Sequence, residues 1–354
     1  MFFRSTRMRT VVVGSGIIGA AIAWQLARTG AQVTIIDAGS AGGLATRHSW
    51  AWINAGNGAS EAYFRLRLHA MQLWREWQIA LPDVPIAWNG SLVWDRTNDE
   101  LIAFSNRVAA LGHTSRLVDR RDIQQLEPQL AAMPELALHF DQDGAVEPLA
   151  ATETLLRAAA DHGAVFIDNH PVRSVETKNS CITGVRTDSG SIAADVVVVA
   201  AGTATNSLLA TVGITIPLAS SPSLLLTTAP HSKILHGMVM SPDAYVRQAA
   251  DGRLLACTDD IAADLLTAMK GMLLGSDELR IESHAIGYRP IPGDGLPAVG
   301  PVDGVHGLYA AVMHSGITLA PAIGQLLAEE ITHGHRNEQL TPFGLERFLS
   351  KPAC

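Results

Sequence analysis

The chain has 354 residues, of which 47% are hydrophobic and 17% are charged, and its formal net charge is −8. A chain of this size can bury a large core and is expected to form two intertwined domains. The negative charge gives no electrostatic reason to bind nucleic acid or an anionic membrane surface. The three cysteines, Cys181, Cys257 and Cys354, are widely spaced, so they predict neither a disulfide framework nor a metal site and favour a cytoplasmic protein.

The first predicted unit is a strand, a glycine turn, a helix and a second strand. An apolar strand at 10–13 leads into Gly14-Ser15-Gly16-Ile17-Ile18-Gly19, a helix continues to residue 28, and the next strand covers 32–36. In this pattern the first glycine allows the tight turn, the second lets the backbone approach a pyrophosphate, and the third lets the helix pack on the strand. The start of the helix offers free N–H groups to the phosphates.

An acidic residue completes this unit. Asp37 follows the second strand, 18 residues after Gly19 (37 − 19). A carboxylate there can accept both hydroxyls of an adenosine ribose and would repel the 2′-phosphate of NADP. The unit therefore predicts a dinucleotide site for a cofactor that lacks this phosphate.

The same region has a competing interpretation. Arg4, Arg7 and Arg9 precede an uncharged stretch from residue 10 to 27, as in a secretory signal or a membrane anchor. Three glycines in one turn weaken such an apolar helix, and cleavage within it would destroy the nucleotide-binding unit. We therefore interpret the stretch as the nucleotide-binding unit and the residues before it as a basic tail.

The elements that follow are helices separated by short strands. Helical spacing covers residues 61–80, 99–111 and 148–162, and strand-like runs occur at 90–94, 164–167, 172–176, 182–187 and 191–194. The continuous apolar run at 196–202 is typical of a strand at the centre of a parallel sheet. The uncharged stretch continues to residue 230, but its glycines and prolines predict a short helix and a loop rather than a membrane span.

The last third of the chain contains two further signals. Asp251-Gly252 lies between strand-like runs at 244–248 and 253–258, which predicts a hairpin. A strand at 308–312, a glycine turn at 314–316 and a helix at 319–331 follow. The nucleotide-binding strands are thus far apart in the sequence, a layout that favours flavin over nicotinamide, because nicotinamide dehydrogenases more often keep these strands contiguous.

This layout predicts an α/β protein with a discontinuous Rossmann-like FAD-binding domain and a second, mixed-sheet substrate-binding domain. We assign residues 1–82, 143–222 and 284–354 to the FAD-binding domain, and residues 83–142 and 223–283 to the substrate-binding domain.

Several blocks resemble the FAD-dependent amino-acid and amine oxidoreductases, which include glycine oxidase, sarcosine oxidase, and D-amino-acid oxidase and dehydrogenase. The blocks are VVVGSGIIGAAIAWQLARTGAQVTIID, AGGLATRHSWAWINAG, ADVVVVAAG, GYRPIPGDGLPAVGP and GLYAAVMHSGITLAPAIGQLLAEEI. The resemblance covers nearly the whole chain, and its last two blocks are the most specific. Sarcosine oxidases carry a cysteine that attaches the flavin before the last block. No cysteine lies between Cys257 and Cys354, so FAD is predicted to be non-covalent.

The resemblance implies which residues contact FAD. The turn around Gly43 matches the segment beside the flavin phosphate and ribityl chain, Val172 matches a position near the adenine, and residues 314–318 match a loop whose N–H groups face the flavin pyrimidine edge. The implied set is Gly14, Gly16, Ile17, Ile18, Gly19, Asp37, Ala38, Gly43, Leu44, Ala45, Thr46, Val172, Ala201, Gly202, Ser315, Gly316, Ile317 and Thr318.

The resemblance also implies residues around the substrate. Arg289 matches the arginine that binds an amino-acid carboxylate, the alternative being an ordinary surface ion pair. Tyr245 matches a position whose phenol adds a hydrogen bond to that carboxylate, or it is a core tyrosine with its hydroxyl at the rim. His48 is expected at the pocket wall or in packing, the alternative being the histidine through which some relatives attach FAD, but its offset from the glycine turn does not match that position. His314 is expected at the active-site wall, with a catalytic role as the alternative. Of Trp50 and Trp52, one is expected to line the pocket and the other to pack in the core.

The implied activity is oxidation of a small primary or secondary amine that carries a carboxylate, such as glycine or sarcosine. Hydride passes from Cα to flavin N5, and the imine hydrolyses to an oxo acid such as glyoxylate plus an amine. Oxygen or another acceptor takes the electrons. The alternative is a flavin subunit of a multi-component opine, hydroxyproline or D-amino-acid dehydrogenase, which passes electrons to partner subunits. A flavin-bound protein without turnover, and assembly as a homo-oligomer, stay open.

Overall fold

The protein was analysed as a computed structural model that describes residues 7–56, 58 and 60–348. Its central layer is a six-stranded sheet in the order β19-β20-β13-β1-β2-β9. The strands are β1 (Arg9–Val13), β2 (Gln32–Ile36), β9 (Val165–Ile167), β13 (Val196–Val199), β19 (Ala298–Pro301) and β20 (Leu308–Val312). All neighbours pair in parallel except β19, which joins the edge antiparallel to β20. Strands from the beginning, the middle and the end of the chain therefore share one sheet, which confirms the predicted fold class.

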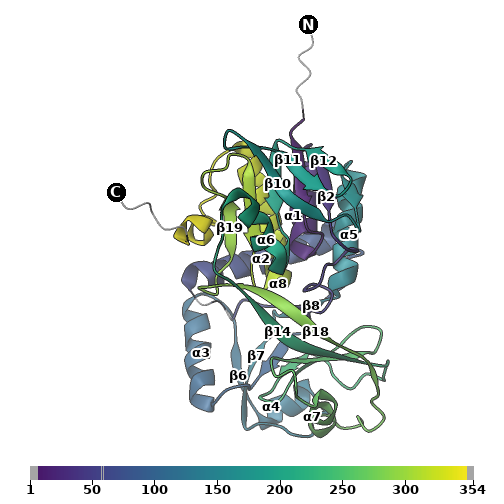
Figure 1. Cartoon of the computed structure of the whole chain (residues 1–354). Coiled ribbons are helices and arrows are strands. Elements are labelled where there is room, and N and C mark those ends of the chain that lie inside the picture. The colour runs from purple at the N-terminus through teal and green to yellow at the C-terminus, as the bar shows by residue number, and fades with distance from the viewer. Residues whose placement is uncertain (1–6, 57, 59, 349–354) are drawn as a thin grey trace.

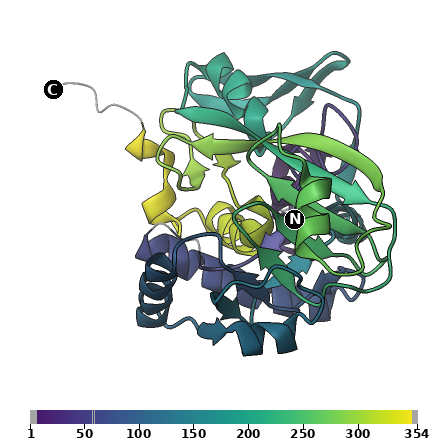
Figure 2. The same cartoon turned by 90° about the horizontal axis from the view of Figure 1, so that it is seen from below.

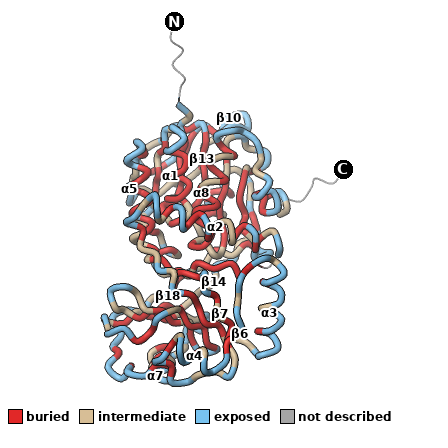
Figure 3. Tube along the Cα trace, turned by 180° about the vertical axis from the view of Figure 1, so that it is seen from behind, coloured by how far each residue is buried: buried red, intermediate tan, exposed pale blue. Residues whose placement is uncertain are grey.

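Helices cover one face of this sheet, and a small sheet covers the other (Figure 1). The helices are α1 (Ile17–Arg28), α2 (Glu61–Ala80), α5 (Pro148–Asp161) and α8 (Gly316–His333). The small sheet consists of β10 (Val172–Lys178), β11 (Cys181–Thr187) and β12 (Gly190–Ala193). Side chains of β1 alternate accordingly: Val12 packs among the helices, whereas Val11 and Val13 pack on the opposite side. Burial on both faces explains why residues 11–13 of β1 and the whole of β13 are apolar (Figure 3).

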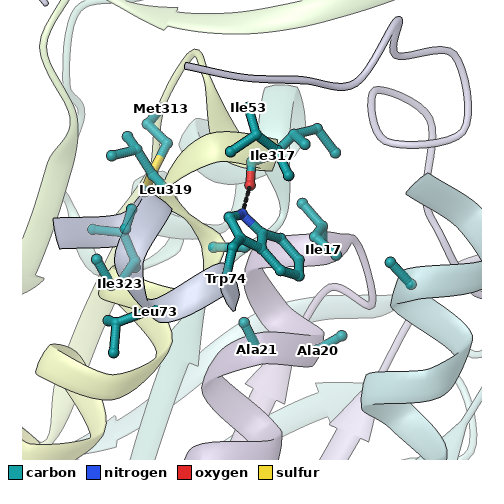
Figure 4. Close-up of a cluster of buried hydrophobic side chains, with 14 of the residues drawn as sticks. Ile17, Ala20, Ala21, Ile53, Leu73, Trp74, Met313, Ile317, Leu319 and Ile323 are labelled. Carbon is teal, nitrogen blue, oxygen red and sulfur yellow. Dashed lines mark hydrogen bonds between the residues drawn. The ribbon is translucent and has the colours of Figure 1, made fainter. Parts of the chain in front are cut away.

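The layer of helices is fixed to the start of α8 by a tryptophan. Trp74 of α2 is fully buried between α1 and α8, and its Nε1 donates to the carbonyl oxygen of Ile317 at 2.9 Å (Figure 4). A buried indole N–H needs such an acceptor. The hydrogen bond from Trp74 of α2 thus fixes the position of the first turn of α8.

A second, eight-stranded sheet lies at the other end of the molecule, in the order β18-β14-β17-β16-β15-β5-β7-β6 (Figures 1 and 2). Its strands are β5 (Ser91–Val93), β6 (Arg116–Asp119), β7 (Leu136–Phe140), β14 (Leu218–Thr228), β15 (Met238–Met240), β16 (Tyr245–Gln248), β17 (Leu254–Thr258) and β18 (Ile281–Pro292). The accompanying helices are α3 (Asn98–Ala110), α4 (Arg120–Leu126) and α7 (Leu265–Met272). The predicted hairpin around Asp251-Gly252 is confirmed, since β16 and β17 pair antiparallel.

The remaining elements are short. A three-stranded sheet contains β3 (Trp52–Ile53), β8 (Gly144–Val146) and β4 (Ile86–Ala87), and α6 (Thr205–Leu209) follows β13. Single 3-10 turns are η1 (Gly202–Ala204), η2 (Ala210–Val212), η3 (Thr341–Phe343) and η4 (Leu345–Arg347).

One predicted loop is a strand. The segment after α6 was expected to be irregular, but β14 runs for 11 residues and pairs with β18 along its whole length. Its Pro222 precedes Leu224, where the pairing with β17 begins, so the missing N–H interrupts only one side of the strand. β14 and β18 form the edge of the eight-stranded sheet that lies nearest the six-stranded sheet (Figure 1).

The N-terminal region contains no long apolar helix. Residues 10–27 form β1, the glycine turn and most of α1, and the tail before them falls largely on residues 1–6, outside the described residues. Within the described part of the chain, every helix is too short or too polar to span a membrane.

Candidate active site

The glycine turn after β1 depends on residues without a side chain. Gly14 has φ +107°, and a Cβ there would overlap the carbonyl oxygen of Ala200. A Cβ at Gly19 would overlap the carbonyl oxygen of Gly14, so α1 can lie close to the turn only with glycine at this position. The mechanical roles predicted for these two glycines agree with these contacts.

Asp37 is fixed at the tip of β2 by donors from two turns. Its Oδ2 accepts from the Ser15 N–H at 2.6 Å and from the Ser15 hydroxyl at 2.9 Å, and its Oδ1 accepts from the Gly39 N–H at 2.9 Å. The carboxylate faces the cavity beside the glycine turn, where its predicted contact with a ribose stays a prediction.

A cavity of about 1100 Å³ begins at the glycine turn and extends to β18 and the start of α8. All of the predicted FAD-binding residues line it except Gly19, which lies behind the turn. The helices α1 and α8 both begin at this cavity, and neither N-cap residue gives its helix a side-chain hydrogen bond. Uncapped helix starts attract negatively charged groups. The cavity, its glycine turn and the two helix starts therefore fit a flavin dinucleotide.

Arg289, on β18, lies at the cavity wall and is held by several acceptors. Its Nη2 donates to the Ser221 hydroxyl at 2.9 Å and to the Pro222 carbonyl at 3.3 Å, and it forms an ion pair with Asp259 at 2.9 Å. The guanidinium Nε is buried and has no hydrogen-bond partner among the described residues. Arg289 thus lines the cavity and forms an ion pair, and its predicted contact with a substrate carboxylate stays a prediction.

Tyr245 and the two predicted histidines also line the cavity. The Tyr245 hydroxyl donates to Asp95, and burial together with this carboxylate raises the pKa of the phenol. His48 packs its Cβ and its carbonyl against Gly287 on β18. Burial lowers the pKa of His314 to about 4, with further lowering from nearby guanidinium groups, so the imidazole is neutral at pH 7.

The prediction that only one of two tryptophans lines the pocket is wrong, because Trp50 and Trp52 both border the cavity. Their rings meet edge to face at 6.1 Å, and each indole N–H has an acceptor: the Leu255 carbonyl for Trp50 and the carboxyl of Asp143 for Trp52, both at 3.0 Å. The turn before β3 gives Ala51 a φ of +65°, which breaks the strand alternation behind the prediction. Burial raises the pKa of Asp143 to about 7.

Sequence reasoning missed two residues of the site. Arg67 of α2 lines the cavity although its side chain is almost fully buried, and Asp259 holds Arg289. Arg67 carried a detectable signal: it falls on the apolar stripe of its helix, four residues after Tyr63 and three before Ala70. Asp259 carried none, because an acidic residue after a strand is ordinary.

The described residues contain no group of three or more histidine, cysteine, aspartate or glutamate side chains that could hold a metal ion. Cys257 borders the cavity as a free thiol, and burial raises its pKa to about 12, so it is protonated at neutral pH.

Comparison with known proteins gave consistent matches over the whole chain. The family model DAO, described as FAD dependent oxidoreductase, matches residues 9–330. An opine oxidase subunit of Agrobacterium tumefaciens is 26% identical over 97% of this chain and 98% of that protein, and glycine oxidase of Bacillus subtilis is 25% identical over 95% and 96%. The crystal structure of glycine oxidase from Geobacillus kaustophilus superposes with a TM-score of 0.88, at 24% identity, over 97% of this chain and 100% of that one.

Proposed function

Because its residues 9–330 match the family model, the chain belongs to the DAO family of FAD-dependent oxidoreductases, and we propose that its substrate is a small amine carrying a carboxylate. Membership makes the protein an FAD-dependent amine or amino-acid oxidoreductase. The finer proposal is glycine, sarcosine or another N-substituted glycine. The observation that carries it is the position of the Arg289 guanidinium at the wall of the cofactor cavity, with its Nη2 fixed by acceptors of the chain.

A guanidinium suits a carboxylate because it offers parallel N–H donors at the spacing of the two oxygens. Arg289 already uses Nη2 for Ser221 and Pro222, which fixes the plane of the group. A substrate carboxylate would accept from the guanidinium in competition with Asp259. Holding the carboxylate in one plane also fixes the Cα–H that must be removed, and such orientation lowers the barrier of the reaction.

When bound, FAD supplies the electron acceptor, taking a hydride at flavin N5. The chain's own contribution is a cavity whose aromatic wall, formed by Trp50, Trp52 and Tyr245, excludes water from the reacting amine. The neutral His314 adds no charge that would repel or trap the amine. A substrate that arrives with a neutral amine needs no proton acceptor from the protein, and the imine hydrolyses after release. FAD is proposed to be held without a covalent bond.

Anaerobic bleaching of the flavin absorbance tests the substrate class. We expect bleaching by sarcosine or a related glycine derivative and none by dimethylamine, which has the same secondary amine without the carboxylate. Bleaching by dimethylamine at similar concentrations would contradict the proposal. A panel that includes D-amino acids and larger N-substituted glycines shows which substituents on Cα and on the amine nitrogen the enzyme accepts. Bleaching by any of these compounds excludes a flavoprotein without turnover.

A second candidate is a flavin subunit that passes electrons to partner proteins. It is favoured by the match to the opine oxidase subunit of Agrobacterium tumefaciens, which extends over almost the full length of both chains. Oxygen uptake by the isolated chain with a bleaching substrate separates the two candidates. Rapid reoxidation in air supports an oxidase, whereas a flavin that stays reduced in air and is reoxidised by a quinone analogue supports the second candidate.

A further inference from the structure

Arg67 is a buried cation whose partners are all neutral. Its Nε donates to the Asn54 carbonyl at 3.1 Å and its Nη2 to Asn54 Oδ1 at 2.7 Å. Its Nη1 donates to the hydroxyls of Ser315 at 2.7 Å and Tyr63 at 3.3 Å. The side chain is 2% exposed, and no carboxylate lies within ion-pair distance among the described residues.

A buried charge without a counter-charge is unfavourable, because burial removes the solvation that the charge has in water. The acid whose titration responds to Arg67 is Asp143, but burial raises the pKa of that carboxyl to about 7, so it does not supply a full negative charge. Arg67 also lines the cofactor cavity. Its position is therefore suited to an anion that enters the cavity.

The same wall carries a second source of positive potential. Ser315, the partner of Nη1, is the N-cap of α8, an 18-residue helix whose first turn borders the cavity. The helix dipole places positive charge at that turn. Trp74 donates to the Ile317 carbonyl and so fixes this turn beside the cavity. Arg67 is one of the two guanidinium groups that depress the pKa of His314, which shows that its charge is felt at this wall.

We propose that Arg67, acting with the start of α8, stabilises the negative charge that the flavin pyrimidine ring acquires on two-electron reduction, and so raises the reduction potential of the bound FAD. The inference rests on the proposed function in one respect, the placement of residues 314–318 at the pyrimidine edge. The substrate supplies both electrons together with the hydrogen, as a hydride that adds at flavin N5. Flavin N1 stays deprotonated and carries the negative charge. Arg67 is a positioning residue here, since it acts through charge and through Ser315.

Sulfite affinity and the midpoint potential test this role without any amine substrate. Sulfite adds to flavin N5 and leaves the same negative charge on the pyrimidine ring. We expect R67M to bind sulfite at least about tenfold more weakly, which for a two-electron couple corresponds to a potential about 30 mV lower. R67K keeps the charge and should stay within about twofold of the parent. The matched control is R65M, because Arg65 lies on the same helix but is exposed and pairs with Glu61.

A second variant covers the case in which R67M does not hold FAD. N54D leaves Arg67 in place and sets a carboxylate 2.7 Å from Nη2, which supplies the missing counter-charge with almost no change of shape. A charge effect predicts weaker sulfite binding and a lower potential for N54D, although the protein stays folded. A purely structural role of Arg67 predicts unchanged values. Parent-like potential and sulfite affinity in folded, FAD-loaded N54D would overturn the inference, whatever the substrate of the enzyme is.

Discussion

Arg289 Nη2 lies 2.9 Å from Oδ1 of Asp259, so the arginine proposed to bind a substrate carboxylate already holds a carboxylate of its own chain. The Asp259 side chain is 73% exposed, whereas that of Arg289 is 27% exposed. Ion pairs with one solvated partner are weak, and the aspartate can turn into water at little cost. An entering substrate therefore competes with Asp259 rather than with a rigid partner.

Asp259→Asn removes this competitor. Because exposed ion pairs contribute about 0.2–1 kcal/mol, we expect a carboxylate-bearing substrate to bind up to about fivefold more tightly. Anaerobic titration of the flavin spectrum measures this affinity. Asp260→Asn, at the next exposed acid, is the matched control and should change little. Weaker binding in Asp259→Asn would mean that Asp259 orients Arg289 instead of competing for it.

Arg289→Met should weaken substrate binding while FAD stays bound. A hydrogen bond to a charged group contributes about 1.5–3 kcal/mol, which predicts a loss of roughly 10- to 150-fold in apparent affinity. Steady-state kinetics and the flavin absorbance of the purified variant report the two effects separately. Arg280→Met, at an exposed arginine just before β18, serves as the control. Kinetics identical to the parent would remove Arg289 from the substrate site.

Gly19→Ala should damage both stability and FAD binding. The added Cβ overlaps the carbonyl oxygen of Gly14, so α1 must move away from the turn, and such overpacking costs about 1–3 kcal/mol. Gly271→Ala in α7 is the contrasting substitution, because a Cβ there has no neighbour within 4 Å. It should raise stability by about 0.5–1 kcal/mol, as alanine favours a helix over glycine. Thermal unfolding and FAD retention on gel filtration compare the two variants.

The buried carboxyl of Asp143 predicts a specific dependence of stability on pH. Its pKa is raised to about 7 in the folded protein against 3.8 for the ordinary side chain, so between these values the folded state binds more protons than the unfolded state. This contribution to stability is therefore lost as pH rises from about 4 to 7. His314 has the opposite effect, since its lowered pKa of about 4 costs stability as pH falls from 6.5.

Asp143→Asn isolates the first of these effects. The amide can still accept from Trp52 and Ser91, while the titration is gone. Urea unfolding at several pH values compares the free energy of unfolding of the variant and the parent. The variant should gain stability relative to the parent as pH rises from about 4 to 7, because only the parent loses the Asp143 contribution. The effect of His314 is the same in both proteins and cancels in the difference. A difference that is constant with pH would show that Asp143 titrates in the same way in the folded and unfolded chains.

Local signals in the sequence predicted the elements whose structure is decided by near neighbours. The turn at Gly14 and Gly19 and the hairpin at Asp251-Gly252 depend on backbone conformations that glycine permits, so residue type and spacing were sufficient. The resemblance added the cavity residues at the far end of the chain, including Arg289. Their predicted contacts with FAD and substrate stay predictions.

Other features depend on pairing between distant segments. β14 is extended because β18 pairs with it over 11 residues, and its own sequence, with serines and a proline, resembles a loop. The place of Arg67 on the apolar stripe of α2 indicates burial, but not that Asn54 and Ser315 surround its guanidinium. Asp259 could not be assigned to Arg289 for the same reason, since 30 residues separate them (289 − 259).

One part of the cavity wall comes from residues 13, 14 and 16–18, and a neighbouring part of the wall comes from residues 311–318. During synthesis on the ribosome, the first part emerges almost 300 residues (311 − 18 = 293) before the second. The nascent chain must therefore keep β1 and its glycine turn available until α8 has been synthesised. A chain that stalls before α8 lacks residues 316–318 of the cavity, so we expect FAD loading to follow the synthesis of this helix.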